Sequence, residues 1–321
     1  MLVATSDPEE RSRLEEALKE KFTNITVKTG NKVSFLGLEI EQDGACIKLS
    51  QRNYIKNMLD EAKVTAKALT PGDHNVWKPS DAPAVDAHEY ASVLMKLMYV
   101  SKRTRPDILP MVTALATYNK NPNQDHWKRL HRVLAYLRYK EDLSLTYHMG
   151  LPYDPQMSTD ASFNLTVDAK GFNGTVIHGN LKNAAVHISM NKQTVTADSS
   201  TESELMALAE SCKVLMHVLG MYEELGYHKD RRGRDGGTVR SPIPVQQDNE
   251  AARLLISTDS YGFKGRSKYF NRKYFLSRDH VESGMITLVQ TKTGNMRADF
   301  LTKVLSGKGF IEGYERLIGC K

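Results

Sequence analysis

The stretch SSTESELMALAESCKVLMHVLGMYEEL, residues 199–225, decides how the second half of this chain folds. Its apolar side chains recur at three- and four-residue spacing, which is typical of a helix with one face against a core. The stripe consists of Leu205, Leu208, Cys212, Leu215, Met216 and Leu219. The sequence therefore predicts one long helix, and the shorter elements around it must supply the surface on which it packs.

Short strand-like and helical runs flank this helix. Strand-like runs precede it at residues 156–163, 171–179 and 184–190, and strands at 242–246 and 285–290 follow it, with helices at 249–257, 268–283 and 296–305. Consecutive strands, followed by strands that alternate with helices, predict an α/β fold in which helices pack on a mixed sheet.

The first half combines a small α/β piece with helices. An Asp-capped helix at 7–22, a hairpin at 33–50 turning at Asp43-Gly44, and a Ser-capped helix at 50–62 come before a loop at 70–85 that is rich in Pro and turn residues. Three helical runs follow, at 87–102, 105–120 and 123–140. We therefore predict two domains, residues 1–150 and 151–321.

Composition limits the class of protein. The 321 residues are 40% hydrophobic and 26% charged, with a formal net charge of +6, and this mild basic bias is compatible with a polyanionic partner. The three cysteines include no CxxC pair, which argues against a zinc site or a disulfide framework. No secretory signal pattern and no apolar run of about 18 residues is found, so we expect an intracellular protein without a membrane partner.

Four carboxylates fall where strands and helices meet. Asp160 lies in the first strand of the second half, Glu204 near the start of the long helix, Asp248 at the end of a strand, and Asp299 at the start of the last helix. If the fold brings them together, cations must neutralise them. Hard oxygen ligands select Mg²⁺ or Mn²⁺, and two such ions about 4 Å apart can drive phosphodiester hydrolysis. Each residue alone also fits a simpler interpretation, as an edge residue, a charge that favours the helix dipole, or a helix cap.

The sequence around these acids resembles the ribonuclease H domain of copia-type LTR retrotransposon polyproteins. SSTESELMALAESCK is similar to the family signature SSTEAEYxAL, TDASF to the first strand, QQDNEAA to the segment of the third carboxylate, and MRADFLTK to the AD-x-LTK motif. Upstream, FLGLEIEQDGACIKLSQRNYIKNML, YASVLMKLMYVSKRTRPDI and NPNQDHWKRLHRVLAYLRY resemble the reverse transcriptase thumb and connection.

The resemblance implies a function and a set of site residues. Asp160, Glu204, Asp248 and Asp299 correspond to the four metal-binding carboxylates, with Glu204 a better match than Glu202. The implied activity is Mg²⁺-dependent hydrolysis of the RNA strand in RNA–DNA hybrids. The polymerase string Tyr-x-Asp-Asp precedes a segment like MLVATSD in the family, so we expect no DNA synthesis from this chain.

Departures from the family leave a second interpretation open. The segment after Asp160 is short and reads VDAKG, KGRSKYF replaces a motif with two histidines, and Met296 replaces a glutamine. The alternative is therefore a non-catalytic remnant that binds nucleic acid or a protein partner.

A basic and aromatic segment suits a phosphate backbone as well as a solvated helix face. Residues 264–278 contain no acid, and the residues that we expect to contact nucleic acid are Lys264, Arg266, Lys268, Arg272 and Lys273.

Overall fold

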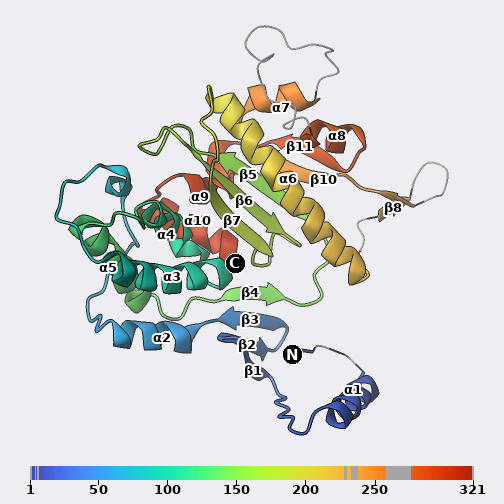
Figure 1. The fold of residues 1–321 in the computed structure, drawn as a ribbon. Helices are drawn as coiled ribbons and strands as arrows, with labels where there is room; N and C mark the ends of the chain where they lie inside the picture. The colour runs from blue at the N-terminus through green and yellow to red at the C-terminus, as the bar shows by residue number, and fades with distance from the viewer. Residues whose placement is uncertain are drawn as a thin grey trace.

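Two sheets organise the chain (Figure 1). The computed structural model describes residues 2–3, 5, 7–227, 230–232, 238–257 and 276–319. The first sheet is antiparallel, in the order β1-β2-β3-β4, and consists of β1 (Lys32–Phe35), β2 (Leu38–Asp43), β3 (Cys46–Ser50) and β4 (Leu145–His148). Its last strand, β4, follows the helical region in sequence and pairs with β3, so the sheet joins the beginning and the end of the first half of the chain.

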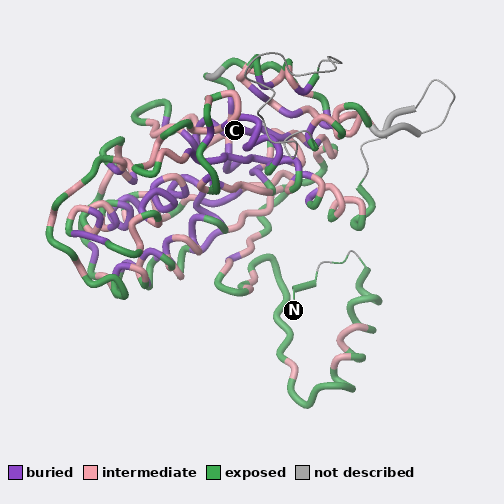
Figure 2. Tube along the Cα trace, turned by 45° about the horizontal axis from the view of Figure 1, so that its top comes forward, coloured by how far each residue is buried: buried purple, intermediate pink, exposed green. Residues whose placement is uncertain are grey.

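The helices of the first half differ in how much they bury. They are α1 (Pro8–Lys21), α2 (Arg52–Glu61), η1 (His74–Trp77), α3 (Ala87–Arg103), η2 (Pro106–Ile108), α4 (Leu109–Ala116) and α5 (Gln124–Tyr139). Asp7 caps α1 as predicted, but α1 buries no residue and projects away from the other elements (Figure 2). By contrast, α4 is buried along most of its length.

The predicted serine cap of α2 is wrong. Ser50 is the last residue of β3, and the N-cap position is Gln51, whose side chain makes no capping bond. Instead, the carboxylate of Glu39 in the neighbouring strand accepts a hydrogen bond from the amide of Asn53 at 2.8 Å. Ser50 is still part of strand β3 and so does not occupy the cap position. A contact from the neighbouring strand takes the place of the local cap.

The second sheet has the ribonuclease H-like arrangement, and the predicted α/β class is confirmed. Its strand order is β11-β10-β5-β6-β7, in which β5, β6 and β7 are antiparallel neighbours while β10 runs parallel to β5 and β11 parallel to β10. The strands are β5 (Gln156–Ala161), β6 (Phe172–His178), β7 (His187–Lys192), β10 (Ile243–Gln247) and β11 (Ile286–Gln290). The first three strands form a meander, and a helix must cross before each parallel strand can join.

The helices of this half match the predicted ones only in part, because the helix expected at 296–305 is limited to Asp299–Thr302, Gly307–Ile318 was not predicted as a helix, and residues 268–275 of another expected helix lie outside the described residues. The helices are α6 (Ser200–Glu224), α7 (Glu250–Ser257), α8 (Leu276–Glu282), η5 (Thr293–Asn295), α9 (Asp299–Thr302) and α10 (Gly307–Ile318). A short ladder of β8 (Asp230–Arg232) and β9 (Thr238–Arg240) follows α6. Helix α6 lies diagonally across the sheet and contacts β5 and β6 (Figure 1). It is long and apolar enough to span a membrane, but half of its most apolar window is buried inside the protein.

The opposite face of the mixed sheet is covered partly by the first half of the chain. Helix α9 contacts β5, β6 and β7, and α4 contacts both α9 and β7. One core cluster joins Leu115 and Tyr136 of the first half to Phe172, Phe300 and Phe310 of the second. The predicted boundary near residue 150 falls between the two sheets and stays a prediction, but the two halves share a core.

Candidate active site

Asp160 lies in the central strand of the mixed sheet, where the backbone of a neighbouring helix approaches closely. It is 2% exposed and pairs across the ladder with Gly174 of β6. A Cβ at Gly174 would meet the side chains of Leu301 and Thr302 at 3.1 Å, so the glycine lets α9 lie against the sheet at this point. The hydroxyl of Thr302 donates a hydrogen bond to Asp160 Oδ2.

Glu204 enters the site from the second turn of α6. Ser199 caps this helix by accepting the amide of Glu202 at 3.1 Å, and the Glu202 carboxylate accepts the amide of Asp198 at 2.8 Å. These two bonds occupy Glu202 at the helix start and leave Glu204, two residues on, facing the sheet. Glu204 is 6% exposed, and its Oε1 accepts the amide of Ala161 at 3.4 Å. Its Oε2 is buried without a hydrogen-bond partner among the described residues.

Asp248 follows β10 directly, and the capping role belongs to its neighbour. Asn249 Oδ1 accepts the amide of Ala252 at 2.9 Å, and the Asn249 carbonyl accepts the amide of Arg253 at 3.0 Å. Helix α7 is therefore capped by Asn249. The interpretation of Asp248 as the cap of this helix is wrong, and its carboxylate lies with the two other acids.

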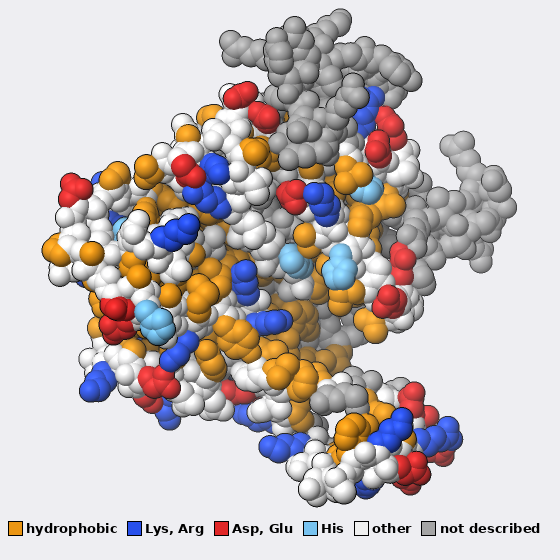
Figure 3. Space-filling model, viewed as in Figure 1, with side chains coloured by type: hydrophobic (Ala, Val, Ile, Leu, Met, Phe, Trp, Pro, Cys, Tyr) orange, Lys and Arg blue, Asp and Glu red, His pale blue; other side chains and the backbone are white. Residues whose placement is uncertain are grey.

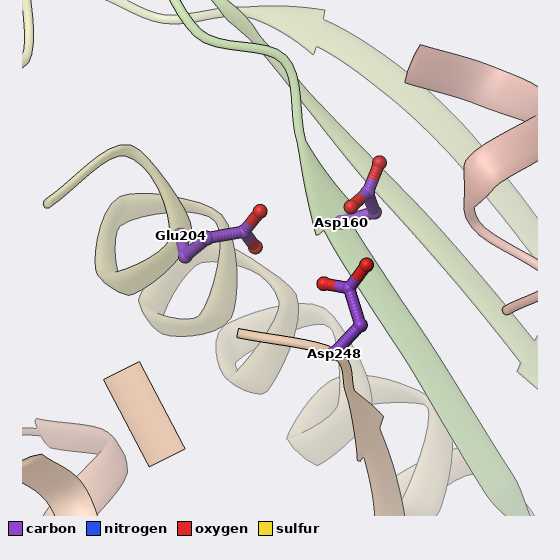
Figure 4. A group of neighbouring side chains, drawn as sticks. All are labelled: Asp160, Glu204 and Asp248. Atoms are coloured by element: carbon purple, nitrogen blue, oxygen red, sulfur yellow. The ribbon is translucent and has the colours of Figure 1, made fainter. Parts of the chain in front are cut away.

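The three carboxylates converge from a strand, a helix and a strand end (Figure 4). One oxygen each from Asp160, Glu204 and Asp248 lies within 4.8 Å of the others, and such a group could hold a metal ion. Burial raises the pKa of Glu204 to about 9, and the charges of Asp160 and Asp248 add to the rise. Burial also raises the pKa of Asp160 to about 6. Burial and mutual repulsion make it unfavourable for these carboxylates to be charged at the same time. A hard divalent cation, which binds carboxylate oxygens and offsets their charge, therefore fits the cluster.

Asp299 takes a different position from the three converging acids. It is the first residue of α9, 7% exposed, and its Oδ1 lies 2.8 Å from Nζ of Lys303 one turn later. Burial raises the pKa of Asp299. The hydrogen bond with Lys303 and the positive charge of Lys303 lower this pKa and so reduce the rise. The start of α9 is tied to β5, because Ser158 Oγ accepts the amide of Ala298 at 3.1 Å. The structure thus brings Asp299 near Asp160, whose pKa it raises, but already paired with a cation.

Two residues of the site were missed at the sequence level. Thr302 holds Asp160, and the positive charge of Lys303 acts on Asp160, Asp299 and Asp248 together. Both belong to the MRADFLTK motif that was quoted for Asp299 alone. The motif was therefore the available signal, but the partners of its threonine and lysine became visible only in the fold.

The predicted nucleic-acid contacts lie outside the described residues. These are Lys264, Arg266, Lys268, Arg272 and Lys273. On the face seen in Figure 3, basic and acidic side chains of the described part are interspersed rather than separated by sign.

Curated proteins similar to this chain are transposon polyproteins. The "Retrovirus-related Pol polyprotein from transposon RE2" of Arabidopsis thaliana is 30% identical over 290 residues, which cover 89% of this chain and 19% of that protein. The Pol polyprotein from transposon TNT 1-94 of Nicotiana tabacum is 26% identical over 334 residues, 99% of this chain and 24% of the relative. The chain is similar to copia- and Ty1-type retrotransposon Pol polyproteins. The predicted resemblance is confirmed, and the chain spans about a fifth of the length of these Pol relatives.

Two further comparisons complete this result. No family model matches the chain. Among solved structures, that of LC11-RNase H1 isolated from compost aligns with a TM-score of 0.33 at 17% identity, covering 46% of this chain and 92% of that one. The ribonuclease H-like assignment follows from the strand order of the mixed sheet itself.

Proposed function

We propose that this chain is a Mg²⁺-dependent ribonuclease H that hydrolyses the RNA strand of RNA–DNA hybrids. The observation that supports the proposal best is the convergence of Asp160, Glu204 and Asp248 within 4.8 Å in a ribonuclease H-like sheet. The raised pKa values of Asp160 and Glu204 favour a site that takes up cations. Similarity to Pol polyproteins supports a nucleic-acid substrate.

The positions of the carboxylates suggest a role for each. Bound Mg²⁺ supplies Lewis-acid polarisation of the phosphate and a more acidic water. Asp160, at the centre of the cluster, would contact both ions. Glu204 and Asp248 would hold the ion near the leaving oxygen, and Asp299 the ion near the attacking water.

The remaining residues of the site orient these ligands. The Thr302 hydroxyl fixes one oxygen of Asp160, which leaves the other oxygen of that carboxylate for a cation. Lys303 pairs with Asp299, and its positive charge would lie near a phosphate bound at the carboxylate cluster. This charge would stabilise the transition state, in addition to the charge of the ions.

Cleavage of a labelled hybrid tests the proposal. We expect the full chain to cut the RNA strand in Mg²⁺ or Mn²⁺ and EDTA to stop the reaction. Asp248→Asn should abolish cleavage without lowering the melting temperature of the metal-free protein, because it removes one charge from a repelling cluster. Glu202→Gln is the matched control, since the Glu202 side chain accepts the amide of Asp198 at the start of α6 and lies outside the cluster.

The same experiment separates the enzyme from the non-catalytic alternative. A hybrid that is bound but left intact in both metals would support a remnant that only binds nucleic acid. Full cleavage by the Asp248→Asn variant would contradict the metal-ligand role of this residue.

A further inference from the structure

A cavity of about 530 Å³ lies in the first half of the chain, and none of its lining residues belongs to the carboxylate cluster. The loop around η1 forms one wall, and the first turns of α5 form the other. The lining residues are Gly72, Asp73, Asn75, Val76, Lys78, Pro79, Ser80, Met111, Asp125, Lys128, Arg129 and Arg132.

Both acids of this cavity are already neutralised. Nη1 of Arg132 lies 2.8 Å from Oδ2 of Asp73, and Nζ of Lys128 lies 3.3 Å from Oδ1 of Asp125. Asp125 also accepts a hydrogen bond from the Ser80 hydroxyl at 2.7 Å. The carboxylates of the lining therefore serve to hold two of its four cations in place.

The other two cations, Lys78 and Arg129, have no ion pair within the described part of the chain. Arg129 is half-buried, and its Nη1 is fully buried without a hydrogen-bond partner among those residues. Burial lowers the pKa of His126, and the positive charge of the Arg129 guanidinium lowers it further. Two cations without ion pairs at one cavity favour a ligand that brings its own negative charge and acceptor oxygens.

We propose that this cavity binds a phosphate group carried by a ligand of nucleotide size, through Lys78 and Arg129. Guanidinium and ammonium groups are the usual partners of phosphate oxygens, and the two cations would supply charge-assisted hydrogen bonds. The volume lies within the range of small-molecule sites and leaves room for a sugar and a base beyond the phosphate. Val76, Pro79 and Met111 supply apolar surface for that remainder.

Binding of 5′-AMP to the full chain in EDTA tests the proposal, with adenosine as the probe that lacks phosphate. Calorimetry measures affinity, and the fluorescence of Trp77, which adjoins Val76 and Lys78 in sequence, gives a second signal. We expect the double variant Lys78→Met/Arg129→Met to bind AMP at least roughly tenfold more weakly. Adenosine should bind wild-type protein at least tenfold more weakly than AMP.

A charge-matched control separates the cavity from general basicity. Arg103→Met/Lys120→Met removes the same charge from two exposed positions that have no ion pair within the described residues, and its affinity should stay within about twofold of wild type. If the Arg129 substitution unfolds the protein, judged by circular dichroism, Lys78→Met alone carries the test because Lys78 is exposed.

A short single-stranded DNA distinguishes the source of the phosphate. Tight binding of AMP with the expected sensitivity to Lys78 and Arg129 assigns a free nucleotide. The same sensitivity with the oligonucleotide but without AMP binding assigns a polynucleotide backbone. Equal losses in the two double variants, adenosine binding as tightly as AMP, or no binding of either ligand would overturn the proposal. Because EDTA is present, failure of this site and failure of hydrolysis are independent results.

Discussion

The two sides of the carboxylate cluster differ in how the negative charge of their buried acids is compensated. On the side of α6 and β10, Glu204 and Asp248 converge on Asp160, and the pKa of Glu204 rises to about 9. On the side of α9, Asp299 is also a carboxylate near Asp160, but its Oδ1 lies 2.8 Å from Nζ of Lys303. The first side could therefore hold a cation from solution, while on the second side the ammonium group of Lys303 supplies the positive charge. The difference predicts that substitutions on the two sides have effects of different kind and size.

The largest effect is expected at the centre of the cluster. Asp160→Asn should lower hybrid cleavage by at least roughly 10³-fold, equivalent to about 4 kcal/mol of transition-state stabilisation, because in the proposed function Asp160 is the ligand that would contact both ions. Single-turnover cleavage measures this loss. Asp168→Asn is the control, since Asp168 is an acid of the same half that pairs with Lys192 at 2.7 Å outside the site. Comparable losses in both variants would remove the special role of Asp160.

The support of α9 is expected to matter next. Phe300 is 3% exposed and packs on Phe310, with ring centroids 5.5 Å apart, in the core that joins the two halves. Phe300→Ala should lower the free energy of unfolding by about 3–5 kcal/mol, since it leaves a cavity in a shared core. Chemical denaturation measures the change, and Phe163→Ala, at a 44% exposed position, should leave stability nearly unchanged. A small effect at Phe300 would mean that α9 depends little on the first half.

The uncompensated side predicts a pH-dependent stability. Glu204 has a folded pKa of about 9 against an ordinary value of 4.5, so between these values the folded state keeps a proton that the unfolded chain has released. The Glu204 contribution to stability therefore falls as pH rises through this window. Metal-free Glu204→Gln should melt roughly 3 °C or more above wild type at pH 8, and the two should converge near pH 4. A constant difference at all pH values would exclude titration of Glu204 as the cause.

The smallest effect is expected on the compensated side. Lys303 lowers the pKa of Asp160, so Lys303→Met should raise that pKa above its present value of about 6. The acidic limb of the pH–rate profile should then shift upward, with a loss of roughly three- to tenfold below pH 7 and a smaller loss at pH 8. Lys308→Met, which breaks an exposed pair with Glu312, is the control and should leave the profile in place. An unshifted limb would show that Lys303 does not act on Asp160.

Local patterns were sufficient for many of the helices and strands and for the positions of the four acids along them. The apolar period of residues 199–225 predicts α6, and the meander followed by alternating elements predicts the mixed sheet. As the sequence predicts, Asp160 lies within a strand, Glu204 near the start of the long helix, Asp248 directly after a strand and Asp299 at the start of a helix. These features are encoded within a few residues or a few turns, where periodicity and chain order determine the outcome.

Partnership across the fold was decided by tertiary structure alone. The sequence could not show that Asn249 caps α7, that Lys303 pairs with Asp299, or that α4 from the first half covers the sheet. The serine cap predicted at Ser50 failed for the same reason, because Glu39 reached that helix from another strand. Each of these contacts joins groups whose competing partners are equally plausible in the sequence. Distances in the folded chain select among them, because hydrogen bonds and ion pairs act over only a few ångströms.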